Sequence, residues 1–205
     1  VEPVVLFTVD EYLYRGKRFD VVPRAAALAA RIPSLRKVVV CSFTGASTPD
    51  VKQVPNAVVW TDFTTPERTG DIAFEQMPAQ HPVYIMFSSG TTGKPKCMVQ
   101  GAAGVLLNHY NEVVLHTDLK PTDVIYYITT CSWMMWNWLL SSLMTGATIV
   151  LYDGNPMYPD LGAMWRLIDE EHVSIFGTSA TYLNYVKSHG LIPKKDFSLA
   201  SLREI

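Results

Sequence analysis

The sequence predicts an α/β fold in which a mostly parallel sheet is flanked by helices. Short runs rich in β-branched residues alternate with helical segments of ten or more residues, and this order is typical of parallel sheets covered on both faces. Hydrophobic residues make up 48% of the 205 residues and charged residues only 18%. That composition is typical of a globular protein with a buried core.

The first part of the chain predicts one helix and one strand, followed by a long connection. Residues 21–32 are rich in alanine and have a helical pattern, and residues 37–43 form a β-branched run typical of a buried strand. Residues 44–82 are polar and punctuated by prolines and glycines, so we expect a long connection there, with one strand near Val58.

The second part, residues 83–205, is interpreted as one α/β subdomain. Strands are expected at 83–87 and 97–100, around a loop at 88–96, and a helix at 103–116 with Leu106, Tyr110, Val113 and Val114 on one face. The expected elements that follow are strand 124–129, helix 133–145 closed by Gly146, strand 147–152, helix 160–171, strand 173–177, helix 179–189 ended by Gly190, and a strand starting near 201.

Charge and cysteine usage exclude several classes of function. The formal net charge is -2 and the 17 Lys and Arg residues are spread along the chain, so no basic stripe suits a nucleic acid. Cys41, Cys97 and Cys131 are far apart and never form a CxxC pair, which predicts free thiols in a reducing cytoplasm. The five histidines, at positions 81, 109, 116, 172 and 189, share no metal-ligand spacing, so no metal site is expected.

Neither secretion nor membrane insertion is expected. The first thirty residues carry charges throughout and have no apolar core behind a basic start. The uncharged stretch 124–152 exceeds the ~20 residues that a bilayer needs, but it contains many polar residues and divides into β-rich, helix-like and β-rich thirds. A buried strand, helix and strand explain it better than a membrane span.

The loop from Ser88 to Lys96 predicts a phosphate-binding site. Its glycines let successive backbone N–H groups converge, its hydroxyls add donors, and its two lysines add positive charge. It is not a Walker A loop, because only two residues separate Gly90 from Gly93 and Pro95 follows Lys94. The alternative is a solvent-exposed turn, but such a turn does not need this many hydroxyls and lysines.

The string YIMFSSGTTGKPKCMVQ resembles the phosphate-binding signature of the adenylate-forming acyl-CoA synthetases. That signature has an aromatic residue, two or three Ser or Thr, Gly, Ser or Thr, Thr, Gly, any residue, Pro and Lys. The strings FEQMPAQHPVYIMFSSGTTG, SWMMWNWLLSSLMTGATIVLYDG and LRKVVVCSF are similar to the acetoacetyl-CoA synthetase branch of this family. The resemblance implies that residues 1–205 belong to the AMP-binding N-terminal domain, truncated at both ends and without the C-terminal domain.

The resemblance also implies a two-step ligase as the parent protein. Acetoacetate would attack the α-phosphate of ATP to give acetoacetyl-AMP and pyrophosphate, and the thiol of coenzyme A would then displace AMP. Mg²⁺ would accompany ATP, with its family ligand mostly outside this chain, and residues 1–205 alone are not expected to be active. Two alternatives stay open: a synthetase for acetate or propionate, and a non-catalytic structural fragment.

Carried over residue by residue, the resemblance implies two groups of site residues. The ATP phosphates would bind to Ser88, Ser89, Gly90, Thr91, Thr92, Gly93, Lys94 and Lys96. Lys96 would be catalytic, because it would stabilise the charge on departing pyrophosphate. The family commonly has Gly or Ala where this chain has Cys97, which we interpret as a buried strand thiol and not as a nucleophile.

The second group would form the acyl pocket. Its implied members are Trp133, Met134, Met135, Asn137, Gly177, Thr178 and Ser179. Bulky residues at 133–135 would leave a small cavity suited to a four-carbon acid, whereas Trp136 and Trp138 are interpreted as core residues. Residues 177–179 follow a strand at its carboxyl end, where α/β sheets bind ligands, although Ser179 could equally serve only as a helix N-cap.

Overall fold

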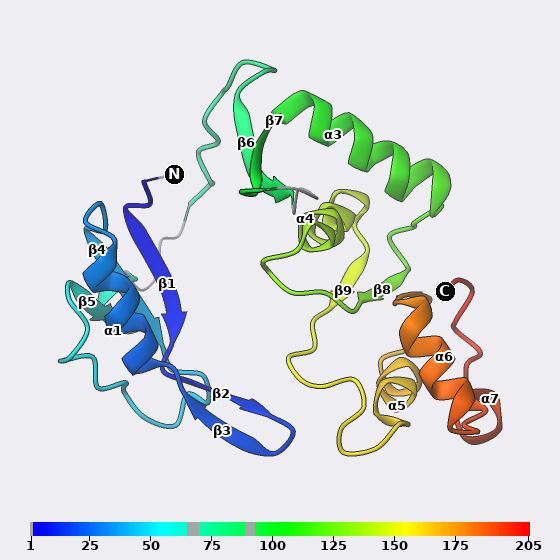
Figure 1. Cartoon of the computed structure of the whole chain (residues 1–205). Helices are drawn as coiled ribbons and strands as arrows, with labels where there is room; N and C mark the ends of the chain where they lie inside the picture. Colours follow the sequence, from blue (N-terminus) through cyan, green and yellow to red (C-terminus); the bar gives the residue numbers. More distant parts are fainter. Residues whose placement is uncertain (1, 65–69, 89–92) are drawn as a thin grey trace. The chain divides into compact units, whose positions relative to one another are not determined.

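The computed structural model describes residues 2–64, 70–88 and 93–205. The chain divides into two compact units, Val1–Ala73 and Phe74–Ile205, which are described separately (Figure 1). The division falls inside the segment that was expected to be a long connection.

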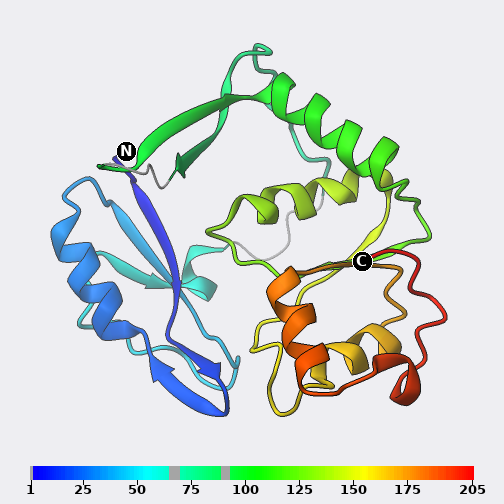
Figure 2. The ribbon, with the colours of Figure 1, turned by 45° about the vertical axis from the view of Figure 1, so that its right-hand side comes forward.

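The first unit is built on a parallel three-stranded sheet. Its strands lie in the order β1 (Val5–Val9), β4 (Lys37–Cys41) and β5 (Ala57–Val59), followed by the short helix α2 (Trp60–Phe63). Helix α1 (Val22–Arg31) lies on one face of this sheet (Figure 2) and has a proline in its first turn, where no backbone N–H is needed. Its buried Ala25 and Ala29 pack against Val38 and Val40 of β4.

The sequence did not predict the antiparallel hairpin of β2 (Glu11–Tyr14) and β3 (Lys17–Asp20). The strands are joined by Arg15 and Gly16, both at positive φ (50° and 73°). Two-residue hairpin loops require this conformation, but Asn-Gly and Asp-Gly are its usual sequence signals, and Arg-Gly is not. Tyr12 and Phe19 stack across the hairpin with ring centroids 5.0 Å apart.

The second unit contains a parallel sheet and an antiparallel hairpin. The sheet order is β10 (Ile175–Gly177), β8 (Val124–Tyr127) and β9 (Thr148–Val150), and the hairpin consists of β6 (Pro82–Ser88) and β7 (Lys96–Gly101). The helices are α3 (Ala102–Tyr110) with the π-helix η1 (Asn111–His116), α4 (Met134–Ser141) with the 3₁₀ helix η2 (Ser142–Thr145), α5 (Ala163–Glu170), α6 (Ala180–Ser188) and α7 (Pro193–Asp196).

These sheets and helices confirm the predicted α/β class, with differences in detail. The parallel strands form two three-stranded sheets, and the strand expected near residue 201 is reduced to a single bridge between Ile175 and Glu204. The helix face expected at 103–116 is partly wrong: Leu106 and Tyr110 are exposed, whereas His109 and Val113 are buried. His109 and Val113 are four residues apart, so the buried face of this helix passes through them and not through Leu106 and Tyr110.

The main core of the second unit is aromatic. Phe176 of β10 is fully buried, with its ring centroid 5.7 Å from those of both Tyr126 and Trp165 and 6.3 Å from that of Tyr182. Helices α5 and α6, side by side in Figures 1 and 2, supply Trp165 and Tyr182. Burial raises the pKa of the Tyr126 hydroxyl and raises that of Tyr182 to about 12, so both stay neutral at physiological pH.

The uncharged stretch 124–152 forms β8, α4 and β9, as the strand, helix and strand prediction stated. None of the helices in the described part of the chain has the length and apolar character needed to cross a membrane. Gly146 follows η2 at a φ of +82°, so the helix ends at the predicted glycine.

A buried carboxylate ties the end of the chain to the sheet. Asp123 accepts hydrogen bonds from Arg203 Nη2 (2.9 Å), Ser174 Oγ (2.8 Å) and the backbone N–H of Lys120 (2.7 Å). Arg203 also donates to the carbonyl of Thr117, at 3.2 Å. This cluster holds residues 203–205 against β10, beside the cavity described below.

We expect Asp123→Asn to lower the free energy of unfolding at pH 7 by about 1.5–3 kcal/mol, as for hydrogen bonds to charged groups. Burial alone would raise the pKa of Asp123, but the hydrogen bonds from Arg203, Lys120 and Ser174 hold it below its usual value. The stabilisation is therefore present above the unfolded-state pKa of about 4 and is lost as the pH falls through the lower folded pKa.

Urea unfolding of the wild type and of Asp123→Asn at pH 7 and at lower pH measures this effect, with exposed Asp71→Asn as the control. If the difference in the free energy of unfolding between wild type and Asp123→Asn stayed constant below about pH 4, the ionised Asp123 would not be the source of the stabilisation.

Candidate functional site

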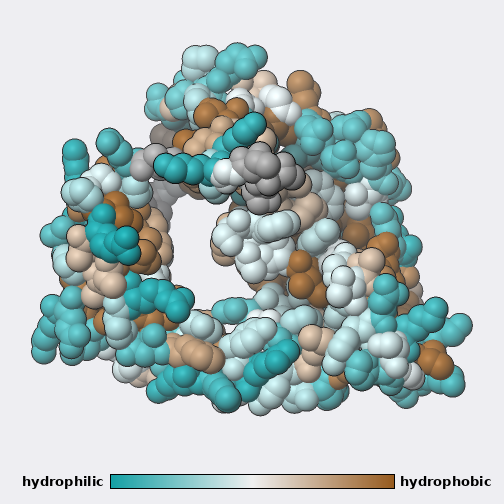
Figure 3. All heavy atoms as spheres, in the orientation of Figure 1, coloured by the Kyte–Doolittle hydropathy of each residue, from teal (hydrophilic) through white to brown (hydrophobic). Residues whose placement is uncertain are grey.

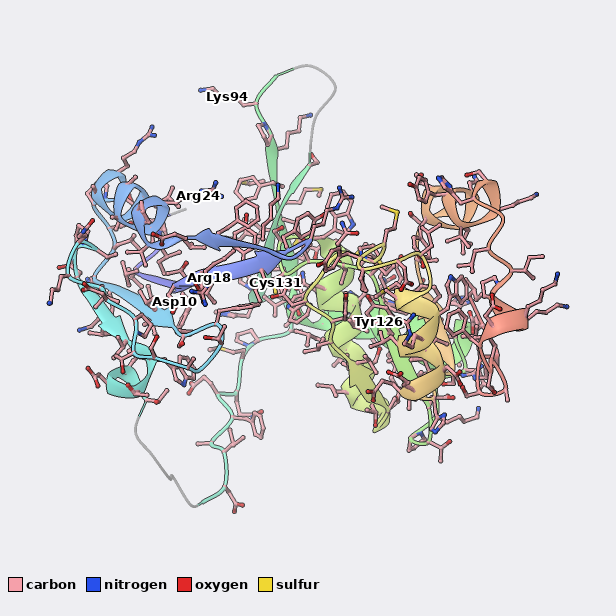
Figure 4. All side chains as sticks on the ribbon, turned by 90° about the horizontal axis from the view of Figure 1, so that it is seen from below. Asp10, Arg18, Arg24, Lys94, Tyr126 and Cys131 are labelled. Carbon is pink, nitrogen blue, oxygen red and sulfur yellow. The ribbon has the colours of Figure 1, made fainter. Side chains whose placement is uncertain are left out.

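The β6–β7 hairpin carries the predicted phosphate-binding loop. In its register Ser88 pairs with Lys96, so the two strands hold the ends of the loop together. Gly93 has a φ of +121°, a conformation that favours glycine. Lys94 and Lys96 are exposed, and the side chain of Lys94 extends away from the hairpin (Figure 4). The predicted phosphate ligands at 89–92 lie outside the described residues.

The prediction that Cys97 is a buried strand thiol is wrong for this chain, because Cys97 is exposed. It pairs with Phe87 across the hairpin, and Phe87 is itself 61% exposed. An apolar strand sequence predicts burial only if another layer covers it, and here the sheet has two strands. Figure 3 shows apolar side chains at the surface over β7 and α3.

A cavity of about 410 Å³ lies between α3, α4 and the ends of β8 and β10. Met134, Met135 and Gly177, three of the predicted acyl-pocket residues, line it together with Tyr127 and Trp138. Trp138 packs edge-on against Tyr127, with ring centroids 5.8 Å apart. We refer to this space as the first cavity.

A second cavity of about 390 Å³ adjoins the first, and Tyr127 and Met135 line both. Its other walls include Trp133, Thr178 and Ser179, which were also predicted. Six of the seven predicted acyl-pocket residues therefore surround two adjoining cavities. The structure does not bring Asn137 to either, because its side-chain amide lies 3.4 Å from the sulfur of Met86 on β6.

Residues 177–179 have local structural roles as well as a place at the cavities. A Cβ atom at Gly177 would lie 1.8 Å from the ring of Tyr127, so the close approach of this ring requires glycine. Ser179 accepts a hydrogen bond from the backbone N–H of Tyr182 at 3.2 Å and thus caps α6, which was the alternative interpretation. Thr178 Oγ1 is buried and has no hydrogen-bond partner among the described residues.

Sequence reasoning missed His109 as a site residue. His109 lines the first cavity from α3, is only 8% exposed, and has its Nδ1 2.7 Å from Ser141 Oγ of α4. Burial lowers its pKa, and the Glu112 carboxylate opposes this with a smaller effect. The imidazole is therefore neutral at physiological pH. Its position four residues before buried Val113, on the same face of the helix, was the available signal.

Comparison with known proteins shows to which family this chain belongs. A family model described as AMP-binding enzyme matches residues 1–205. The chain belongs to this family of AMP-binding enzymes. It is 40% identical over 210 residues to acetoacetyl-CoA synthetase of Danio rerio, a match that covers all of this chain and 31% of that protein.

Two further matches have similar extent. Malonamoyl-CoA synthetase vrtB of Penicillium aethiopicum is 39% identical over 210 residues, covering 95% of this chain and 29% of that protein. The solved structure of acetoacetyl-CoA synthetase from Streptomyces lividans matches with a TM-score of 0.89 and 41% identity, covering 99% of this chain and 30% of that one. The present AMP-binding chain thus spans about 30% of the length of these relatives.

Proposed function

We propose that this chain supplies the phosphate-binding hairpin and the acyl pocket of an acetoacetate-CoA ligase. The full-length enzyme would activate acetoacetate with ATP to acetoacetyl-AMP, and would then transfer the acyl group to coenzyme A, releasing AMP. The observation that carries the proposal is the gathering of six predicted acyl-pocket residues around two adjoining cavities. About 40% identity to named acetoacetyl-CoA synthetases supports the choice of acid.

In this proposal the hairpin stabilises charge on the departing pyrophosphate. Lys94 and Lys96 are exposed and can reach a bound anion, and Gly93 permits the backbone to approach the phosphates closely. Ser88 and the predicted ligands at 89–92 would hold the β- and γ-phosphates. A lysine charge fixed where negative charge develops lowers the free energy of the transition state.

The two cavities have large apolar side chains in their walls. Their shared wall consists of Tyr127 and Met135, and the large side chains at 133, 134 and 138 line one cavity or the other. We assign the acyl pocket to Trp133, Met134, Met135 and residues 177–179, and leave Asn137 out because it faces Met86.

We assign Mg²⁺ to the bound nucleotide rather than to a ligand set of this chain. No group of three His, Cys, Asp or Glu side chains gathers as a metal site within residues 2–64, 70–88 and 93–205. The three cysteines are free thiols, which supports a location in the reducing cytoplasm.

A second candidate acid is malonamate, because of the match to a malonamoyl-CoA synthetase. Malonamate and acetoacetate have the same length and share a carbonyl group β to the carboxylate. They differ in an amide NH₂ in place of a methyl group. The Glu112 carboxylate lines the first cavity and could accept a hydrogen bond from such an amide.

An acid panel on the full-length protein tests the proposal. ATP–pyrophosphate exchange reports adenylate formation, and thioester formation that depends on coenzyme A reports the second step. We expect kcat/KM for acetoacetate to exceed that for acetate and propionate by at least ~10-fold, because the shorter acids lack the terminal atoms of acetoacetate and lose their contacts with the pocket wall. A higher value for acetate or propionate would overturn the assignment, and a higher value for malonamate would favour the second candidate.

We expect Met135→Ala to change chain-length specificity more than Met134→Ala, because Met135 lines both cavities and Met134 lines one. Each methylene of an acid contributes ~1–3 kcal/mol of discrimination, so kcat/KM for six-carbon relative to four-carbon 3-oxo acids should rise by tens of fold. Exposed Met144→Ala on η2 is the control. Unchanged ratios together with lower overall activity would assign Met135 to packing alone.

A further inference from the structure

Adenylate formation joins two groups that different elements of the second unit would bind. The acid would lie between α3, α4 and the ends of β8 and β10, whereas the ATP phosphates would lie at the loop of the β6–β7 hairpin. The reacting atoms must approach to about 3–3.5 Å, and a misplacement of about 1 Å can cost ~10²-fold in rate. Contacts that fix α4 relative to the hairpin therefore affect the rate of this step.

Helix α3 is a direct extension of the hairpin. Strand β7 ends at Gly101 and α3 begins at Ala102, with no residue between them (Figure 1). The backbone N–H of Ala102 also donates to the carbonyl oxygen of His81, next to the start of β6, at 2.9 Å. A side chain of α3 that holds α4 therefore holds it relative to the phosphate-binding strands.

A chain of hydrogen bonds joins α3 to α4. Ser141 Oγ donates its only proton to the carbonyl oxygen of Asn137, one turn earlier in α4, at 3.0 Å. His109 Nδ1 lies 2.7 Å from the same hydroxyl oxygen, so Nδ1 carries the ring proton and donates a hydrogen bond to Ser141. His109 is buried and Ser141 is half-buried, so little water competes for this bond.

The same face of α4 has a second contact with the hairpin. Asn137 and Ser141 are four residues apart and therefore lie on one side of the helix. Asn137 Nδ2 donates to the sulfur of Met86 at 3.4 Å, and Met86 lies on β6 two residues before Ser88. This face thus contacts both a strand of the hairpin and, at His109, the helix that continues it.

Apolar packing alone fixes the position of α4 less narrowly. Leu139 of α4 is buried in one cluster with Val113 of η1 and Ile125 of β8. Hydrophobic contacts are not directional, whereas a hydrogen bond weakens steeply when its angle departs from linear. The bond from His109 to Ser141 therefore restricts the rotation and sliding of the helix that carries the methionine wall of the first cavity.

We propose that His109 and Ser141 are positioning residues for adenylate formation, because their hydrogen bond fixes α4, and with it the methionine wall of the acyl pocket, relative to the phosphate-binding hairpin. This proposal rests on the function proposed above. In this role neither side chain needs to touch the reacting atoms. The pair keeps the carboxylate of the bound acid in line with the α-phosphate of ATP.

The test compares three variants of His109 in the full-length enzyme by ATP–pyrophosphate exchange. For His109→Phe, which lacks the donor, we expect kcat to fall by ~10- to 100-fold and KM for acetoacetate to change by less than ~3-fold. His109→Asn should recover most of kcat, since its amide nitrogen can lie near the place of Nδ1 and donate to Ser141. His109→Gln should not, since its amide nitrogen lies near the place of Nε2.

Removal of the acceptor tests whether the recovery depends on Ser141. We expect Ser141→Ala to lower kcat as His109→Phe does. When combined with Ser141→Ala, His109→Asn and His109→Gln should have equal kcat, because the amide of asparagine then has no hydroxyl to donate to. Exposed His116→Asn on η1 is the matched control, with unchanged kcat and an unchanged circular dichroism spectrum.

A merely structural role of His109 predicts the same loss for His109→Asn and His109→Gln, with or without Ser141. That result, an unchanged kcat in His109→Phe, or a loss that appears only in KM would overturn the positioning role and leave the proposed function intact. A wild-type full-length enzyme that does not activate acetoacetate would instead overturn the proposed function.

Discussion

Replacement of Lys96 by alanine in the full-length enzyme is expected to slow adenylate formation by ~10²–10³-fold, as for the loss of one charge-stabilising donor. Lys96 is exposed at the start of β7, opposite Ser88, so its side chain contributes charge rather than packing. The measurement is ATP–pyrophosphate exchange at saturating acetoacetate. KM for acetoacetate should change little, because Lys96 lies outside the linings of both acyl cavities.

Lys194→Ala on α7 is the matched control, because Lys194 is also exposed and lies outside the hairpin. Circular dichroism of both variants should match the wild type. Near-normal kcat for Lys96→Ala, or a loss of rate that accompanies unfolding, would show that Lys96 only shapes the turn.

Replacement of Phe176 by alanine is expected to destabilise the chain by about 3–5 kcal/mol, the usual cost of removing a buried aromatic ring. Phe176 is fully buried and contacts the rings of Tyr126, Trp165 and Tyr182. The loss of stability combines two costs: the free energy gained by transferring the ring from water to the core is lost, and an unfilled cavity remains. Urea unfolding followed by circular dichroism measures the change in the free energy of unfolding.

Phe74→Ala serves as the comparison, since Phe74 is 77% exposed. Its effect should stay within about 0.5 kcal/mol, as is usual for surface substitutions. If Phe176→Ala were as mild as Phe74→Ala, the aromatic cluster would not be the stabilising core of the second unit.

Local sequence pattern was sufficient for most helices and strands. The alanine-rich pattern at 21–32 became α1 (Val22–Arg31), and the β-branched run at 37–43 became β4 (Lys37–Cys41). The spacing of hydrophobic residues and the residues that cap helices depend only on near neighbours along the chain. They can therefore be recognised in the sequence without knowledge of the fold. The hairpin at Arg15 and Gly16 was missed because its turn lacks the residues that usually mark positive φ.

The α/β class and the loop motif at 88–96 could be read from the sequence, and its resemblance to a family predicted that residues 133–135 and 177–179 belong to one pocket. Three features depend on the packing of distant segments: Asn137 faces Met86, Cys97 is exposed, and His109 lies within hydrogen-bond distance of Ser141. Sequence pattern could not predict these contacts, because they join residues that are far apart along the chain. His109 and Ser141 are 32 residues apart, on α3 and α4, and a contact of this kind forms only when two helices pack.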